Sequence, residues 1–258
     1  MRHAFISLVM VAASFAASRA VAAPSAPSAA ELCALALQNR PTEQLQERQG
    51  CEVVQTRAVP KGALKRAVVV RVPLNEGTVD LLMIEVAAKG GKTAWQDLGP
   101  VAGQTGKMGD MRFDSTLESL EVRPTTGGPR VIAAVLQRRS MGDSGGRSIV
   151  VRHEWLVCGA DGTEVVCVSL ADRVSLAVEG DMADLTPYAW TRTVTVDPAG
   201  AIAVGQKAGT GEVGPFDPGP GTHSLTSLAD RPTVRLYPVT PWVHPDALKD
   251  DPPLALPE

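Results

Sequence analysis

Residues 147–170, RSIVVRHEWLVCGADGTEVVCVSL, decide how this chain folds. Two runs rich in β-branched residues flank Asp161-Gly162, a dipeptide strongly favoured in tight hairpin turns. Alternate side chains of a strand point to opposite faces. One face of the first run therefore carries His153 with four apolar residues, Ile149, Val151, Trp155 and Val157. The stretch predicts a hairpin of two antiparallel strands, over residues 147–158 and 163–170.

The same pattern extends over most of the chain. Short β-branched runs separated by Gly, Pro, Asn and Asp predict strands at 52–57, 64–72, 79–87, 117–122, 130–138, 173–178, 190–196 and 201–206. Residues 197–200, DPAG, predict a type I turn. Helical periodicity is clear only at 29–38, with a second helical turn expected at 43–48. The fold class predicted is all-β, a mainly antiparallel sandwich or barrel-like set of sheets, with a short N-terminal helix.

The first 22 residues have the composition of a cleaved secretory signal. Arg2 supplies a positive charge, and residues 4–17 form an uncharged apolar run that is too short to span a bilayer comfortably. The small residues AVAA follow at 20–23, as a signal-peptidase site requires. We therefore expect residues 1–22 to be a signal peptide and the mature chain to begin at Ala23, in the periplasm or outside the cell. No later segment is apolar enough to predict a transmembrane anchor.

The mature chain is expected to form one domain. Residues 23–28 are an Ala/Pro/Ser spacer, residues 29–238 a single β-rich domain with a helical lead-in, and residues 239–258 a Pro- and Asp-rich tail. Without residues 1–22 the chain carries 23 basic and 28 acidic side chains, a formal charge of −5. Because nucleic-acid-binding proteins normally present a basic surface, no nucleic-acid partner is expected.

The four cysteines predict two disulfides. An even number of cysteines in an exported chain is typical of disulfide bonding. Cys33 and Cys51 are close in sequence, as are Cys158 and Cys167, and each pair brackets a plausible turn, so we predict these two pairings. The second disulfide is expected on the outer, less apolar face of its hairpin. No zinc site is expected, because neither pair has C-x-x-C spacing or a neighbouring His.

Residues 142–146, GDSGG, resemble the segment around the nucleophile of chymotrypsin-like serine proteases. The resemblance covers five residues and implies Ser144 as the nucleophile. In that family the general-base His and the Asp precede the Ser in the chain. Here the only His before Ser144 is His3, which belongs to the predicted signal peptide. We therefore interpret 142–146 as a flexible turn between two strands and predict that Ser144 is not catalytic.

Three histidines and one tryptophan are weaker candidates for a site: His153, His223, His244 and Trp242. His153 lies on an apolar strand face, where a hydrogen-bonded core residue is commoner than a catalyst. His223 and His244 lie in Pro/Gly-rich sequence whose spacing selects no metal geometry. Trp242 could anchor a ligand or pack the tail onto the sheets. We identify no complete catalytic, cofactor-binding or metal-binding constellation.

These features favour an exported β-domain with a binding, interaction or structural role in the cell envelope. Its expected partner is an envelope protein or a small ligand. The alternative is an envelope hydrolase whose site is assembled from dispersed Asp, Glu and His residues. A deep pocket with convergent acids or histidines would favour the hydrolase, and a flat open sheet would favour binding.

Overall fold

The computed structural model describes residues 27–37, 50–59, 61–74, 77–102, 105–108, 111–142, 145–162, 164–180, 185–211 and 217–229. The predicted signal peptide, most of the spacer, the helical turn expected at 43–48 and the tail at 239–258 lie outside these ranges.

The first part of the chain forms a four-stranded antiparallel sheet, here called the first sheet. Its strands follow in chain order: β1 (Glu52–Ala58), β2 (Leu64–Leu74), β3 (Gly77–Ala87) and β4 (Thr93–Ala102). The short 3-10 segment η2 (Lys89–Gly91) connects β3 to β4. Sequence analysis missed β4, because Gly99 and Pro100 interrupt its pattern. The strand still forms because it pairs with β3 alone, and an edge strand tolerates a residue without a backbone N–H.

The centre of the molecule is a seven-stranded antiparallel sheet, here called the second sheet. Its order is β13-β10-β9-β8-β7-β6-β5. The bounds are β5 (Thr105–Met108), β6 (Met111–Arg123), β7 (Arg130–Gly142), β8 (Gly146–Asp161), β9 (Glu164–Gly180), β10 (Tyr188–Thr191) and β13 (Ala208–Gly209). The predicted hairpin is confirmed: Asp161 of β8 pairs with Glu164 of β9 across a two-residue turn.

In two places the predicted division of the chain into strands is wrong. The strands expected at 163–170 and 173–178 are one strand, β9, in which a β-bulge at Asp172 absorbs the irregularity. The strand expected at 190–196 divides at Arg192: β10 stays in the second sheet, and β11 (Val194–Val196) belongs to another sheet.

A third, three-stranded sheet has the order β11-β12-β14, with β12 (Ile202–Val204) and β14 (Gly221–His223). The turn predicted at 197–200 joins β11 to β12, with the Gly200 amide donating to the Asp197 carbonyl. A short helix, α2 (Leu225–Ala229), follows β14 and was not predicted.

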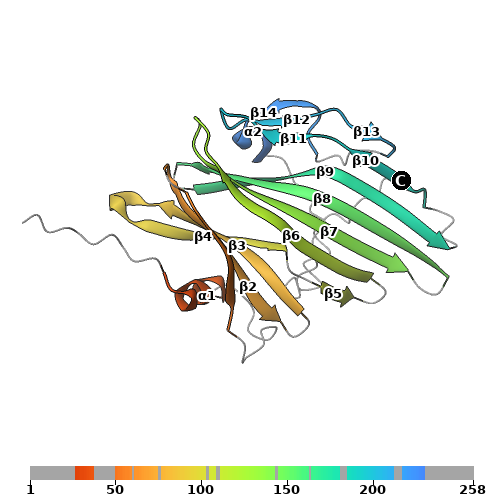
Figure 1. Cartoon of the computed structure of the whole chain (residues 1–258), viewed down its shortest axis with the longest axis horizontal. Coiled ribbons are helices and arrows are strands. Elements are labelled where there is room, and N and C mark those ends of the chain that lie inside the picture. The colour runs from red at the N-terminus through yellow and green to blue at the C-terminus, as the bar shows by residue number, and fades with distance from the viewer. Residues whose placement is uncertain are drawn as a thin grey trace, which may run out of the picture.

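The three sheets stack as layers, so of the two predicted arrangements the described residues show the sandwich (Figure 1). The first and second sheets share one apolar core, built from residues such as Val69, Leu82, Val131 and Leu156. The third sheet and α2 pack on the opposite face of the second sheet, around Ile132, Val157 and Ile202. Both faces of the second sheet are therefore covered along part of its length, which explains how few of its positions are exposed.

The N-terminal helix, α1 (Ala29–Leu37), lies on the outer face of the first sheet (Figure 1). Its start is a capping box: the Glu31 amide donates to the Ser28 hydroxyl, and the Ser28 amide donates to the Glu31 carboxylate. These bonds with Ser28 lower the pKa of Glu31. Leu32 and Ala36 are buried against β2 and β3. Within the ranges above, neither helix is long and apolar enough to cross a membrane.

Both predicted disulfides form, Cys33 with Cys51 and Cys158 with Cys167, with Cα atoms 5.6 and 4.1 Å apart. The first ties α1 to the start of β1. The second joins directly paired positions of β8 and β9. Its expected position on the outer side is wrong, because Cys158 is fully buried in the core shared by the first two sheets. The face of β8 that looked less apolar is the one that meets the first sheet.

Candidate functional site

Part of the interface between the first and second sheets is polar. On β2, Ala67 and Val69 face the second sheet within the shared core, and strand alternation places Arg71 on the same face. Arg71 pairs in register with Asp80 of β3, and Gln55 of β1 pairs with Val69. Since directly paired residues point to the same face, the side chains of Gln55, Arg71 and Asp80 point toward the second sheet.

Strand β6 supplies the opposite wall. Leu117 packs against the shared core, so Ser115, two residues earlier, faces the same interior space. Ser115 pairs in register with Gln137 of β7, which pairs with Arg152 of β8. A row of polar side chains, Ser115, Gln137 and Arg152, therefore crosses the inner face of the second sheet, and all three are buried.

A cavity of about 320 Å³ lies between the two walls. It is lined by β1, β2, β3 and β6 through Val54, Gln55, Arg71, Thr78, Asp80, Asp114, Ser115, Thr116 and Leu117. Asp80 is 2% exposed and Ser115 4%, whereas the side chain of Arg71 is 41% exposed. The cavity therefore has a closed inner end and a mouth near Arg71. No His, Cys or Lys is among these nine residues, and the ionisable side chains of the lining are those of Arg71, Asp80 and Asp114.

Arg71 and Asp80 form a two-point ion pair inside the cavity. Arg71 Nε donates to Asp80 Oδ1 at 2.7 Å, and Arg71 Nη2 donates to Oδ2 at 2.9 Å. The hydrogen bonds to Asp80 raise the pKa of Arg71, against the opposing effect of burial. The pair cancels its own charge and leaves the Nη1 group of Arg71 outside these two bonds.

Three buried polar atoms of the described chain have no hydrogen-bond partner: Gln55 Oε1, Ser115 Oγ and Gln137 Oε1. The first two belong to opposite walls of the cavity, and the third belongs to the residue that pairs with Ser115. An unsatisfied buried polar atom costs about 1 to 3 kcal/mol. Two such atoms on opposite walls of one interior space indicate a place where a donor from outside the protein is accommodated.

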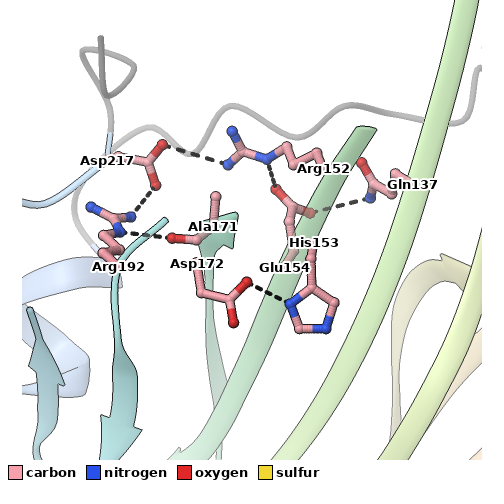
Figure 2. Close-up of polar contacts among 8 residues, drawn as sticks. All are labelled: Gln137, Arg152, His153, Glu154, Ala171, Asp172, Arg192 and Asp217. Carbon is pink, nitrogen blue, oxygen red and sulfur yellow. Dashed lines mark hydrogen bonds and ion pairs between the residues drawn. The ribbon is translucent and has the colours of Figure 1, made fainter. Parts of the chain in front are cut away.

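Beyond Gln137 the polar row continues as a fully connected network (Figure 2). Gln137 Nε2 donates to Glu154 Oε2 at 3.2 Å, and Arg152 Nε donates to Glu154 Oε1 at 2.5 Å. Asp217 lies between two arginines, 3.6 Å from Arg152 Nη2 and 2.8 Å from Arg192 Nη2. This network differs from the cavity because both oxygens of Glu154 and of Asp217 have partners within it.

Burial and pairing act on the two arginines in opposite directions. Burial lowers the pKa of Arg192, and the Asp217 carboxylate opposes that shift. Burial also acts to lower the pKa of Arg152, but the carboxylates of Glu154 and Asp217 outweigh it, so the pKa of Arg152 is raised. The Asp217 carboxylate thus opposes the effect of burial on the pKa of both arginines.

His153 lies on the other face of β8, as its strand position predicts, and it is buried. Its Nδ1 is 2.5 Å from Asp172 Oδ1, and its Nε2 is 3.1 Å from Glu118 Oε2. Trp155 donates to the second oxygen of Asp172 at 2.7 Å. Both ring nitrogens of His153 thus face carboxylates, and Figure 2 shows the imidazole pointing toward Asp172.

Two β-bulges bring these carboxylates to His153. The pairing of β8 with β9 skips Asp172, and the pairing of β6 with β7 skips Glu118. A bulged residue is released from strict alternation and can turn its side chain out of the expected row. The Asp172–His153 contact resembles half of a general-base arrangement, but Nε2 meets Glu118, where such a base would need a nucleophile. The geometry is that of a hydrogen-bonded core histidine.

The remaining sequence candidates do not converge on one place. His223 lies at the end of β14, where its Nε2 is 2.9 Å from the Gly219 carbonyl oxygen. His244, Trp242 and Ser144 lie outside the described residues. The segment 142–146 connects β7 to β8, so its predicted position between two strands is confirmed. Across the ranges that the structure describes, no group of three or more His, Cys, Asp or Glu could hold a metal ion.

Sequence analysis missed the residues of the cavity and of the polar row. One signal was present: Arg152 and Glu154 share a strand face with Val150 and Leu156, so both faces of that strand carry apolar residues. A strand with two apolar faces predicts burial on both sides, and polar residues within it are then interior. Gln55 and Ser115 carry no such signal, because their burial depends on how the two sheets meet.

A second hollow of about 400 Å³ lies beside the turns that follow β1 and β6, lined by Pro124 and Pro129 among others. None of the three unpartnered atoms belongs to its lining, so the cavity between the sheets is the stronger candidate. Comparison of the chain with protein-family models, with curated proteins and with solved structures gives no match.

Proposed function

We propose that this protein is an exported, non-catalytic binding protein of the cell envelope, and that a small polar ligand occupies the cavity between its first and second sheets. Neither of the two arrangements expected from sequence, a pocket of convergent acids and histidines or a flat open sheet, describes this cavity. It is an interior space in which two polar atoms, Gln55 Oε1 and Ser115 Oγ, lack protein partners and in which Arg71 and Asp80 form an internally neutral ion pair.

The observation that carries the proposal is the pair of unpartnered atoms, Gln55 Oε1 and Ser115 Oγ, on opposite walls of one cavity. A fold that only needed stability would be better served by apolar side chains at these positions, because unsatisfied buried groups are destabilising. A ligand that supplies hydrogen bonds to both walls removes that cost, and its binding then stabilises the folded state.

Export supports this role. The two disulfides are consistent with an oxidising compartment. Together with the signal-like sequence of residues 1–22, they support a periplasmic or secreted location. Among the roles expected in the cell envelope, the cavity favours binding of a small ligand over a purely structural role.

Native mass spectrometry of the full mature chain, released gently from its native envelope, tests the proposal. We expect a population heavier than the disulfide-bonded chain by the mass of one small molecule, and we expect this adduct to be lost in Gln55→Leu and in Ser115→Ala. Ser148→Ala is the matched control, because Ser148 is also buried in the second sheet but donates to the Met141 carbonyl at 3.3 Å. An adduct that persists in both cavity variants would place the ligand elsewhere, and a chain isolated only at its own mass would contradict the proposal.

The alternative is an envelope hydrolase that uses Asp172 and His153 as its acid–base pair. The short contact between the two side chains favours it, and the Glu118 carboxylate at Nε2 opposes it. Reaction with a fluorophosphonate probe that is lost in Ser144→Ala and also in a histidine variant, His153→Ala, His223→Ala or His244→Ala, would support this alternative. We expect no such labelling.

A further inference from the structure

We propose that the ligand of the cavity is a neutral polyhydroxylated molecule of about monosaccharide size. This inference rests on the proposed function, since it names the chemical class of the ligand for the same cavity. It is argued from the charge, the hydrogen-bonding groups and the size of the lining.

The interior charge of the cavity is already balanced. Asp80, the buried acid, is held by two hydrogen bonds from Arg71, and the other acid of the lining, Asp114, is exposed. A charged ligand would leave water for a space whose only buried charges neutralise one another, and moving a charge out of water without a counter-charge is strongly unfavourable. A neutral ligand avoids this cost.

The unpartnered atoms require hydrogen-bond donors. Of the two that line the cavity, Gln55 Oε1 is an amide oxygen that can only accept. Ser115 Oγ can donate or accept, and Arg71 Nη1 lies outside the two bonds to Asp80 and can only donate. A ligand that carries both hydrogen-bond donors and acceptors on adjacent atoms can bond to this combination of accepting and donating groups. A hydroxyl group provides one donor and two acceptor positions, so several hydroxyls on one small frame fit the lining without a net charge.

The volume of the cavity and the apolar residues of its lining also fit a neutral polyhydroxylated ligand. The volume of about 320 Å³ is at the lower end for small-molecule sites, which excludes large ligands. Val54 and Leu117 offer aliphatic surface from opposite sheets, which suits the C–H face of a polyol. No aromatic residue is among the lining, so a flat aromatic ligand finds no stacking partner there.

Isothermal titration calorimetry of the full mature chain tests the inference with four probes: the neutral polyols myo-inositol and sorbitol, the diamine putrescine and the dicarboxylate succinate. We expect saturable binding of a polyol that is weakened about tenfold in Ser115→Ala and in Gln55→Met, because loss of one ligand hydrogen bond in a buried site is of that order. The control Ser148→Ala should bind as the unaltered chain does.

Each other outcome overturns the inference in a distinguishable way. Binding of putrescine or succinate with the same sensitivity to Ser115→Ala would overturn the neutral class and leave the proposed binding function standing. Polyol binding that both variants leave unchanged would place the polyol outside this cavity. If no probe binds, the polyol class is wrong, and the adduct measured by native mass spectrometry separately decides whether the cavity binds a ligand at all.

Discussion

Asp217 is the residue on which the paired part of the polar interior depends. Its carboxylate contacts Arg192 at 2.8 Å and Arg152 at 3.6 Å, and its side chain is only 4% exposed. Arg192 also donates to the Ala171 and Pro218 carbonyls, and its guanidinium lies 5.4 Å from the centre of the Trp190 ring. One acid therefore links the segment at 217–220 to β8 and to the connection between β10 and β11, and it balances charge that no apolar neighbour could.

We predict that Asp217→Ala lowers the free energy of unfolding by about 3 to 5 kcal/mol, because it leaves buried guanidinium charge uncompensated. Glu179→Ala, which removes an exposed acid near the end of β9, should change stability by less than about 0.5 kcal/mol. Urea denaturation of both variants measures the difference. Equal effects of the two substitutions would show that the network contributes no more than a surface charge.

At the scale of elements, α1 is the one most dependent on a covalent bond. A helix of nine residues is marginal in isolation, and this one buries only Leu32 and Ala36 on the first sheet. The capping box at Ser28 and Glu31 satisfies its first amides. The Cys33–Cys51 disulfide, whose cysteines are 18 positions apart, restricts the unfolded chain by about 3 kcal/mol in the chain-entropy model.

We predict that the double variant Cys33→Ala and Cys51→Ala loses hydrogen-exchange protection at the amides of α1 while β8 and β9 keep theirs. The matched variant Cys158→Ala and Cys167→Ala should leave the protection of α1 unchanged, because that disulfide lies in the core between the sheets. Retained protection of α1 in the first variant would mean that packing alone holds the helix.

Element by element, the strands whose β-branched runs are uninterrupted could be predicted from sequence, as could the helix at 29–37 and the turn at 197–200. The hairpin turn predicted at 160–163 lies one residue too early, since Asp161 pairs with Glu164. The failures have local physical causes. Gly99 and Pro100 obscure β4, and Asp172 makes one strand look like two because a bulge resembles a strand end in sequence. Arg192 sits inside a run of alternating residues, yet its buried side chain marks the point where the chain passes from the second sheet to the third.

At the scale of the whole molecule, the candidate site could not be predicted because it depends on which faces of the sheets meet. His153 was a candidate in sequence because it is a lone histidine on an apolar strand face. The structure places it in a hydrogen-bonded cluster away from the cavity. Ser115 and Gln55 resemble ordinary solvent-facing strand residues in sequence. They become interior only when the first sheet packs on the second, a contact between strands distant in the chain.

The proposed export concerns the whole chain and gives a direct prediction. Mature protein purified from the native envelope should begin at Ala23, because the apolar run at 4–17 and the small residues at 20–23 match the pattern of a signal-peptidase substrate. Intact mass measurement checks this. A chain that retains Met1 would contradict export and, with it, the envelope location.

The central claim is that the unpartnered polar atoms of the cavity serve a ligand and lower the stability of the ligand-free fold. One comparison of unfolding free energies tests this claim most directly. Ser115 and Ser148 are buried to 4% and 7% exposure in the same sheet, but only Ser148 Oγ has a partner, the Met141 carbonyl. In urea denaturation without added ligand, we predict that Ser115→Ala raises the free energy of unfolding by about 1 kcal/mol, whereas Ser148→Ala lowers it by a similar amount. If Ser115→Ala instead lowers stability as much as Ser148→Ala does, the Ser115 hydroxyl is satisfied within the fold itself, and the cavity is a structural feature of the core.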